Sequence, residues 1–372
     1  MIVPVNEPLI VPRARKLVLD CLKTGWISSA GSYIGEFEHK FASYIGTRYA
    51  ATTTSGTSAL HLALASLGIG KGDEVIIPDL TIISCALAVI YTGAVPVVVD
   101  VEPSTGTIDP KKIEEKITKQ TRAIMVVHLY GHPANLDPII DLSRKYRLFL
   151  VEDAAEAHGA EYKGKKVGGI GDVGAFSFYG NKIVTTGEGG MVVTNQKSIY
   201  EKAILLKDLA HSKRQRFLHE EIGFNYRMTN IQAALGLAQL EKIERFIAKK
   251  RWMAGRYAKA WKNEPLLEVP TEAPWAKSVY WMYAVRLKKK APLSRDTLRM
   301  RLKELGVDTR DFFLPLHRQP CLRKLGLCRN VHCPQTVDLS KRGFYVPSGL
   351  AITPAQIGFV LSAMEKSLYE TA

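Results

Sequence analysis

The segment LFLVEDAAEAHG, at residues 148–159, carries the clearest indication of the architecture of this chain. Its first half is apolar and leads to the acidic residue Asp153, as in a parallel strand that is buried on both faces. Strands of this kind are joined by helices, and open α/β sheets place ligands at the carboxyl ends of their strands. The stretch therefore predicts an α/β sheet with a ligand site close to Asp153.

The same alternation of apolar strand and amphipathic helix fills the first two-thirds of the chain. Hydrophobic periodicity predicts helices at residues 11–23, 35–45, 57–67, 83–91 and 138–146, and strands at residues 74–77, 95–99, 123–128 and 148–152. Glycine and proline mark the joints between these segments. We expect a mostly parallel sheet with helices on both faces.

The pattern changes near Asn230. One long helix is predicted from there to Trp261, followed by a half-exposed strand within residues 278–288 and a capped helix at residues 294–306. We therefore expect two domains: a large α/β domain over residues 1–245 and a small α+β domain over residues 246–372.

Length and composition agree with this division. The 372 residues are 46% hydrophobic and 23% charged, which is typical of a globular protein with sizeable cores. No apolar run approaches the ~20 residues that span a bilayer, and the first residues lack the order of a secretion signal. We expect a cytoplasmic protein without membrane contact.

The net charge of +15 raises the question of nucleic acid. The basic residues are dispersed, however, with local runs only at residues 211–219, 249–251 and 288–290, and no nucleic-acid-binding module accompanies them. We expect a solvated basic surface that also attracts an anionic substrate. A cofactor-bearing regulator that binds DNA is the alternative from another functional class.

Five cysteines are too few and too scattered to predict a disulfide framework. Cys321, Cys328, His332 and Cys333 are close in sequence and have the donor types of a zinc site. No CxxC spacing supports that interpretation, so we expect incidental thiols on a loop and no metal.

The stretch FSFYGNKIVTTGEGGM, at residues 176–191, places Lys182 between a short strand and a glycine-rich turn. A cofactor aldehyde that is held as a Schiff base needs such an amine, and Asp153 offers a carboxylate for a protonated ring nitrogen. Together they predict a pyridoxal-phosphate site. Taken singly, Lys182 is as compatible with a surface lysine, and Asp153 with a helix N-cap.

Pyridoxal phosphate also needs an anion site, which the start of a helix provides through its free N–H groups and its dipole. TTTSGTSALHLALASLG, at residues 52–68, supplies a strand end followed by Ser55, Gly56 and Thr57 and then a helix. Ser177, just before Lys182, is within the same expected site. This junction is common by itself and gains meaning from its position upstream of Asp153 and Lys182.

These motifs, with PDLTIISCALAVIYTGAVPVVVD at 78–100 and GFNYRMTNIQAALGLAQL at 223–240, resemble those of the sugar-nucleotide aminotransferases of the DegT and StrS type. The resemblance covers nearly the whole chain and implies the fold-type-I architecture of pyridoxal-phosphate-dependent transferases. VPVNEPLI, GWISSAGSYIGEFEHKFASYIG and FYGNK are most similar to members that aminate C4 of GDP-4-keto-6-deoxymannose with L-glutamate for O-antigen polysaccharide. Amination of a UDP- or dTDP-linked 4-keto or 3-keto sugar is the alternative.

The resemblance assigns roles to individual residues. It implies that Lys182 forms the Schiff base, that Asp153 pairs with the pyridine nitrogen, and that Glu156 lies near the cofactor's hydroxyl. Gly56, Thr57 and Ser177 would hold the phosphate. Asn225 of a neighbouring subunit would join them, which implies a homodimer with shared active sites.

Other positions are less certain in their role. Ile82 stands where many relatives have an aromatic residue against the pyridine ring. The resemblance implies that Trp26, Ser28, Ser29 and His317 contact the sugar nucleotide. The alternatives are that Trp26 is a core tryptophan and that His317 is a loop histidine. The glutamate carboxylate has three candidate partners, Arg214, Arg227 and Arg310.

Overall fold

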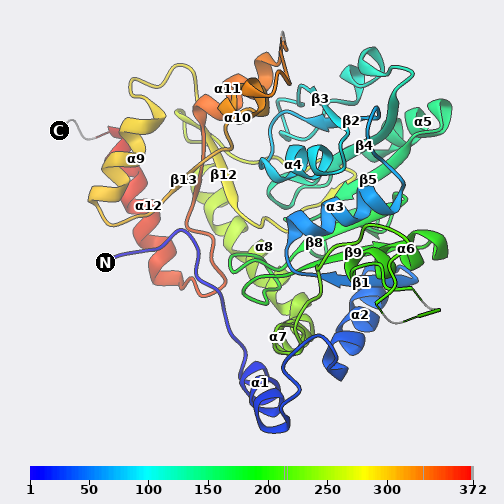
Figure 1. Ribbon diagram of the computed structural model, residues 1–372. Coiled ribbons are helices and arrows are strands. Elements are labelled where there is room, and N and C mark those ends of the chain that lie inside the picture. Colours follow the sequence, from blue (N-terminus) through cyan, green and yellow to red (C-terminus); the bar gives the residue numbers. More distant parts are fainter. Residues whose placement is uncertain (213, 216, 330, 370–372) are drawn as a thin grey trace.

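A computed structural model describes residues 1–212, 214–215, 217–329 and 331–369. Two positions of the basic run 211–219, Lys213 and Arg216, lie outside the described residues. The described chain forms a large α/β region and a C-terminal region beside it (Figure 1), and the N-terminal segment begins next to the C-terminal region. A β-bridge between Val3 and Val307 fixes that segment there.

The large region is built on a seven-stranded sheet in the order β1-β9-β8-β5-β4-β2-β3. Strands β3, β2, β4, β5 and β8 run parallel, whereas β9 pairs antiparallel with both β8 and β1. The strands span Tyr49–Thr53 (β1), Glu74–Pro78 (β2), Val95–Val99 (β3), Thr121–Val127 (β4), Phe149–Asp153 (β5), Val173–Ser177 (β8) and Gly190–Thr194 (β9). The expected mostly parallel sheet is confirmed.

Helices cover this sheet. Helices α3 and α4 contact each other and pack against the sheet, and α5 packs against β4 and β5. Right-handed crossovers, which are the rule for parallel strands, would place α4 and α5 on opposite faces. Helices α1 and α2 pack against α7 at the β1 end (Figure 1). The helices of the large region are α1 (Pro12–Thr24), α2 (Ser32–Ile45), α3 (Gly56–Ser66), α4 (Ser84–Tyr91), α5 (Leu136–Tyr146), α6 (Lys197–Lys207) and α7 (Asn230–Leu240). Short 3-10 turns occur at η1 (Pro110–Lys112), η2 (Glu114–Lys116) and η3 (Leu129–Gly131).

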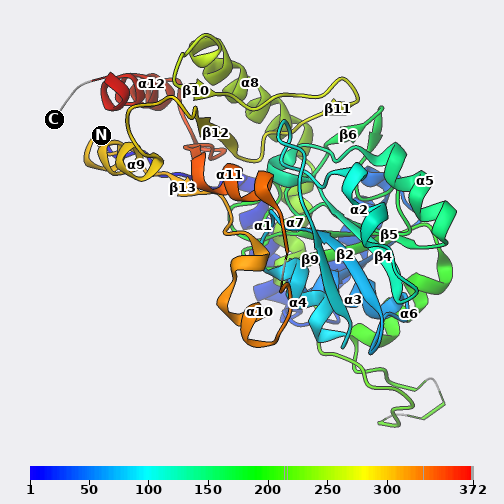
Figure 2. The same ribbon diagram turned by 90° about the horizontal axis from the view of Figure 1, so that it is seen from above.

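The C-terminal region contains an antiparallel sheet in the order β10-β12-β14-β13, seen from above in Figure 2. Its strands are β10 (Leu267–Glu268), β12 (Tyr283–Leu287), β13 (Arg310–Asp311) and β14 (Gly343–Val346), and its helices are α8 (Ile243–Trp261), α9 (Arg295–Glu304), η4 (Leu316–Arg318), α10 (Pro320–Lys324), α11 (Pro334–Arg342) and α12 (Pro354–Tyr369). A three-stranded sheet joins β6 (Glu161–Tyr162) and β7 (Lys165–Lys166) to β11 (Ala276–Lys277). Among the described residues, no helix is both long and apolar enough to cross a bilayer.

Two hydrophobic cores underlie these regions, and α8 contributes to both. Ile243 and Phe246 pack into the core around the large sheet, whereas Tyr257 and Trp261 pack into the core of the C-terminal sheet. The domain boundary expected after residue 245 falls inside this helix, and it stays a prediction.

The segment beyond Asn230 differs from the single long helix that the sequence predicts. The helix breaks between α7 and α8, where Lys242 has φ −115° and ψ 8°. The break lets α7 pack against α1 and α2 while α8 continues toward the C-terminal core. The strand expected within residues 278–288 begins only at Tyr283, because Tyr280 has a left-handed backbone with φ 47°.

Candidate active site

The predicted cofactor residues meet in one cavity of about 380 Å³ at the carboxyl ends of the parallel strands. That volume is within the range of small-molecule sites. The lining includes the predicted residues Ser55, Gly56, Thr57, Ile82, Asp153, Glu156, Ser177 and Lys182. It also includes Ser84, Trp281, Phe313 and Tyr345. Strand ends, one helix start and the C-terminal region therefore build a single site.

Lys182 lies in the turn between β8 and β9, and its side chain is 10% exposed. Its Nζ is 3.9 Å from Glu156 Oε1 and 3.9 Å from the centroid of the Trp281 ring. Burial lowers the pKa of this amine, and the negative charges of Glu156 and Asp153 oppose the shift. The alternative of a surface lysine is wrong, and a lysine with a lowered pKa is suited to nucleophilic attack on an aldehyde.

Asp153 is the last residue of β5 and is 2% exposed. Its Oδ1 accepts a hydrogen bond from the N–H of Ala155 at 3.0 Å, and its Oδ2 accepts from Cys85 Sγ at 3.1 Å. Burial raises the pKa of the carboxyl, while the two donors and the positive charge of Lys182 oppose the rise. Residues 154–159 form turns rather than a helix, so the alternative of a helix N-cap is wrong.

Glu156 follows in the turn after β5. Its Oε2 accepts a hydrogen bond from the N–H of Tyr130 at 2.7 Å. Burial raises the pKa of Glu156 to about 7, although the charge of Lys182 favours the ionised form. The cavity thus holds two buried carboxyl groups and one buried amine whose protonation states depend on one another.

The start of α3 forms one side of the cavity. Ser55 caps the helix by accepting from the N–H of Ser58 at 3.1 Å, in a capping box. Among the described residues, no acceptor is found for the N–H groups of Gly56 and Thr57. A Cβ on Gly56 would lie 2.7 Å from Ser177 Cβ, so glycine lets the helix start approach β8. Thr57 Oγ1 donates to Ser84 Oγ at 2.9 Å.

This arrangement fits pyridoxal phosphate. Free N–H groups at a helix start suit a phosphate dianion, a buried carboxylate suits a protonated pyridine nitrogen, and an amine with a lowered pKa suits an aldehyde. Ile82 is 42% exposed and lines the cavity with an aliphatic side chain. Many relatives are expected to have an aromatic ring at this position.

The predicted sugar-nucleotide residues lie outside this cavity within one chain. Trp26 is 58% exposed, and the turn containing Ser28 and Ser29 is held by Asn230, which donates from Nδ2 to the Trp26 carbonyl and from its N–H to the Ser28 carbonyl. His317 is buried and contacts Asp79. Their roles as substrate contacts stay predictions, as does the role of Asn225, which accepts from Arg227 Nε at 3.0 Å.

The three arginine candidates for the glutamate carboxylate differ in position. Arg310 lines a hollow that adjoins the cavity and shares Tyr179, Asn181 and Tyr345 with it. Arg227 is paired with Asp208 at 2.9 Å, and Arg214 lies in the exposed segment after α6. Arg310 is therefore the candidate that lies beside the cavity of its own chain.

Two residues that contact the site were not predicted from the sequence. Cys85 on α4 contacts Asp153, and Trp281 covers Lys182 while its Nε1 donates to the Asn181 carbonyl at 2.8 Å. No local pattern marks them, since each depends on a contact between distant segments. The left-handed Tyr280 just before Trp281 is the turn that brings the ring to the cavity.

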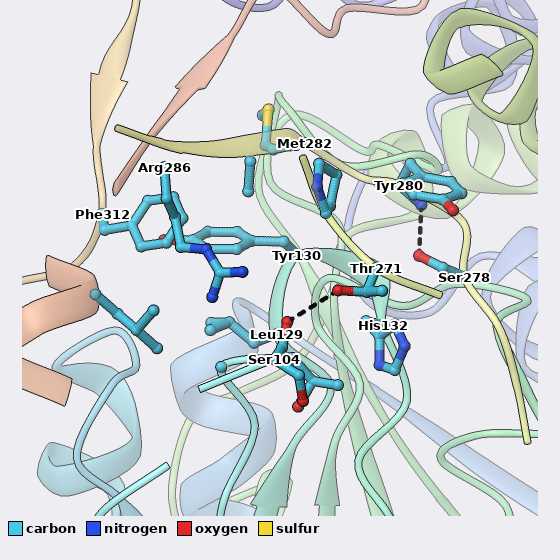
Figure 3. Close-up of a pocket in the computed structure, with 15 residues that line it drawn as sticks. Ser104, Leu129, Tyr130, His132, Thr271, Ser278, Tyr280, Met282, Arg286 and Phe312 are labelled. Carbon is cyan, nitrogen blue, oxygen red and sulfur yellow. Dashed lines mark hydrogen bonds between the residues drawn. The ribbon is translucent and has the colours of Figure 1, made fainter. Parts of the chain in front are cut away.

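A smaller hollow of about 50 Å³ lies behind the Tyr130 ring (Figure 3). Its lining includes residues 104–106, Thr271 and Arg286 of β12. Thr271 Oγ1 donates to the Ser104 carbonyl at 3.4 Å. It does not include Lys182 or Asp153, so Tyr130 separates it from the cavity described above.

The whole chain resembles known proteins. The sequence model of the DegT/DnrJ/EryC1/StrS aminotransferase family matches residues 8–365. The GDP-perosamine synthases of Escherichia coli O157:H7 and Caulobacter vibrioides are each 42% identical to the chain, over 364 and 367 residues, with 98% of both chains covered. The X-ray structure of DesV from S. venezuelae, in complex with a ketimine intermediate, has a TM-score of 0.90 at 34% identity and covers 96% of this chain and 95% of that one.

Proposed function

Since the chain belongs to the DegT/DnrJ/EryC1/StrS aminotransferase family and is a pyridoxal-phosphate-dependent enzyme, we propose that it converts GDP-4-keto-6-deoxymannose to GDP-perosamine. The amino donor is L-glutamate. The observation that carries this choice of substrate is the 42% identity to two GDP-perosamine synthases over 98% of the chain. We further propose that the product is used for O-antigen polysaccharide and that the enzyme acts in the cytoplasm.

The cavity residues divide the work by their chemistry. Gly56 and Thr57 hold the cofactor phosphate with backbone N–H groups, and Ser177 adds its hydroxyl. Asp153 keeps the pyridine nitrogen protonated, because Cys85 and the N–H of Ala155 fix its carboxylate. When bound, pyridoxal phosphate supplies an aldehyde for the amino group and a ring that withdraws electrons from the carbon that loses a proton.

Lys182 attaches the cofactor and then serves as a base. Burial favours its neutral amine, so its Nζ can take the α-proton of glutamate and later return a proton to C4 of the sugar. Trp281 lies over this amine and shields it from water, and Phe313 adds a second apolar ring to the lining of the same cavity. The nearby Glu156 accepts a hydrogen bond from the backbone N–H of Tyr130 and would lie near the hydroxyl of the bound cofactor.

The active unit is a homodimer. Asn225, Trp26, Ser28 and Ser29 lie outside the cavity of their own chain, which is expected if they serve the neighbouring subunit. Helix α1 and the turn after it expose Leu19, Leu22, Trp26 and Ile27. A contiguous apolar surface of this kind supports subunit contact.

The test is a comparison of donors and acceptors. The enzyme is incubated with L-glutamate and, in separate reactions, GDP-4-keto-6-deoxymannose, a UDP-linked 4-keto sugar and a dTDP-linked 3-keto sugar, and each product is identified by mass spectrometry and NMR. We expect a 4-amino sugar from the GDP substrate with the highest kcat/KM. Amination of a UDP or dTDP sugar alone would overturn the substrate and leave the family assignment intact.

A further inference from the structure

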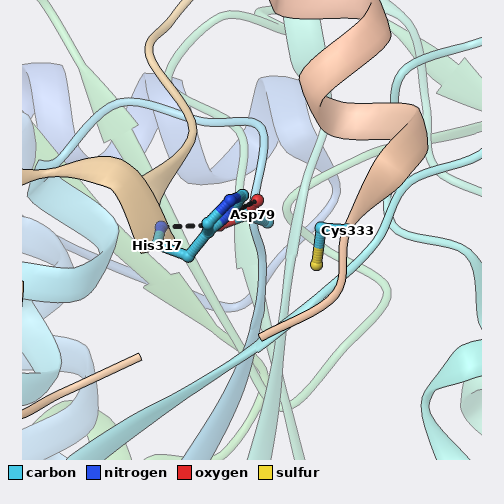
Figure 4. Close-up of side chains that lie close together, drawn as sticks. All are labelled: Asp79, His317 and Cys333. Carbon is cyan, nitrogen blue, oxygen red and sulfur yellow. Dashed lines mark hydrogen bonds and ion pairs between the residues drawn. The ribbon is translucent and has the colours of Figure 1, made fainter. Parts of the chain in front are cut away.

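A second group of chemically active side chains lies outside the cofactor cavity. Asp79 follows β2, His317 lies in η4, and Cys333 immediately precedes α11 (Figure 4). One ligand atom of each residue, an oxygen, a nitrogen and a sulfur, lies within 4.8 Å of the other two. Each residue is less than one-tenth exposed. Three distant segments of the chain therefore present three different donor atoms to one buried point.

We propose that Asp79, His317 and Cys333 bind a zinc ion. Carboxylate, imidazole and thiolate are the ligands that zinc uses in proteins, and its tetrahedral bonds place neighbouring donor atoms roughly 3.3–3.8 Å apart. The three donor atoms lie within 4.8 Å of one another, so zinc binding would require small adjustments of the side chains. The present contact between His317 Nδ1 and Asp79 Oδ2, at 2.5 Å, shows that both groups face the same point.

The charge of the ligand set is compatible with zinc at this buried point. A carboxylate, a thiolate, a neutral imidazole and Zn²⁺ have no net charge together, and a neutral cluster is the form that a buried site accommodates. Binding releases the thiol proton of Cys333 to solvent.

The ion would join the C-terminal region to the loop between β2 and α4, which borders the cofactor cavity. Asp79 is three residues before Ile82, and this loop also carries Thr81 and Ser84, which line the cofactor cavity. The other two ligands, His317 and Cys333, come from η4 and from the residue before α11. A zinc ion here is structural, and its removal is expected to loosen the loop without removing any residue that contacts the cofactor.

Metal content tests the proposal directly. The holoenzyme, produced without a histidine tag, is loaded with zinc, dialysed and analysed by inductively coupled plasma mass spectrometry. We expect about one zinc ion per chain in the wild type. The Cys333→Ser variant should lose zinc affinity by about tenfold or more. The matched control is Cys321→Ser, which removes an exposed thiol and should leave the zinc content unchanged.

The Cys333→Ser variant is expected to fold, because Asp100 separately holds the start of α11 by accepting from the N–H groups of Gln335 and Thr336 at 3.0 and 2.8 Å. Should it not fold, cobalt replaces zinc in the Cys321→Ser protein, where a thiolate-to-cobalt absorption band is expected. Folded wild-type protein that takes up no zinc and gives no cobalt band would overturn the proposal, as would equal zinc content in Cys333→Ser.

Discussion

The Lys182 amine lies 3.9 Å from the centroid of the Trp281 ring, so a residue of the large region and a residue of the C-terminal region are in contact. The Trp281 Nε1 donates to the Asn181 carbonyl, which fixes the ring beside the turn that carries Lys182. The environment of the amine therefore depends on where the C-terminal region lies. A shift of one region relative to the other would expose Lys182 to water.

Removing this ring should therefore impair catalysis. Because the ring lies over the amine, Trp281→Ala should open the amine to water, raise its pKa toward the ordinary value and lower kcat/KM by about tenfold or more. Trp281→Phe keeps an aromatic face and should retain most of the activity. Steady-state kinetics on both variants provide the measurement, and equal kinetics for Trp281→Ala and wild type would show that the ring is not needed.

Loss of the central amine should be far more severe. Lys182→Ala removes both the attachment point and the base, so turnover should fall by about a thousandfold or more. The visible absorbance of the attached cofactor should disappear as well. Lys145→Ala, which removes an exposed lysine paired with Glu114, is the control and should keep wild-type turnover.

The phosphate-binding helix start leaves no room for a side chain. In Gly56→Ala the new Cβ would lie 2.7 Å from Ser177 Cβ, so the helix start must move and cofactor affinity should fall by about tenfold or more. Gly35→Ala is the matched control, since its Cβ meets no atom within 4 Å and alanine is preferred in a helix. Titration of the cofactor-free proteins with pyridoxal phosphate gives both affinities. An unchanged affinity in Gly56→Ala would argue against a close contact there.

The buried Glu156 makes the stability of the cofactor-free protein depend on pH. Its pKa rises from 4.5 to about 7 on folding, so the folded state binds a proton that the unfolded state releases. The contribution of this group is fully present below pH 4.5 and is lost as the pH rises through about 7. The loss is about 3 kcal/mol.

Glu156→Gln removes this ionisation, so the free energy of unfolding of the variant should decline less than that of the wild type between pH 4.5 and 7. Urea unfolding at several pH values measures the difference. Parallel pH profiles for the two proteins would mean that Glu156 titrates at its ordinary value.

Hybrid dimers test the shared active site. Lys182→Ala and Asn225→Ala homodimers should both be impaired when assayed alone. If Asn225 serves the neighbouring subunit, a mixed dimer contains one site with both substitutions and one site with neither, so mixing and reassociation should restore activity. No recovery in mixtures whose subunits have exchanged would place Asn225 in the site of its own chain or in none.

Local sequence patterns were sufficient to predict most of the large sheet and the cofactor half of the cavity. Asp153 and Ser177 are at strand ends, and Gly56 and Thr57 begin a helix, so each position follows from a short stretch. The positions of Trp281 and Cys85 do not follow from a short stretch. Trp281 is placed by its contact with Asn181, and Cys85 by its contact with Asp153.

Tertiary contacts also explain the differences from the predicted elements. The helix after Asn230 has no proline or glycine at its break, and only its packing partners on the two cores require Lys242 to leave the helical conformation. The group of Asp79, His317 and Cys333 also depends on tertiary contacts. Sequence proximity suggested Cys321 and His332, both of which are exposed, whereas the buried grouping draws Asp79 from a distant loop.

The most direct measurement is the mapping of the attached lysine. The holoenzyme is reduced with borohydride, digested, and analysed by mass spectrometry for the pyridoxyl-phosphate group. We predict the label on Lys182 alone. A label on another lysine would contradict the account, above all on Lys250, which is also buried and has its pKa lowered by burial to about 7.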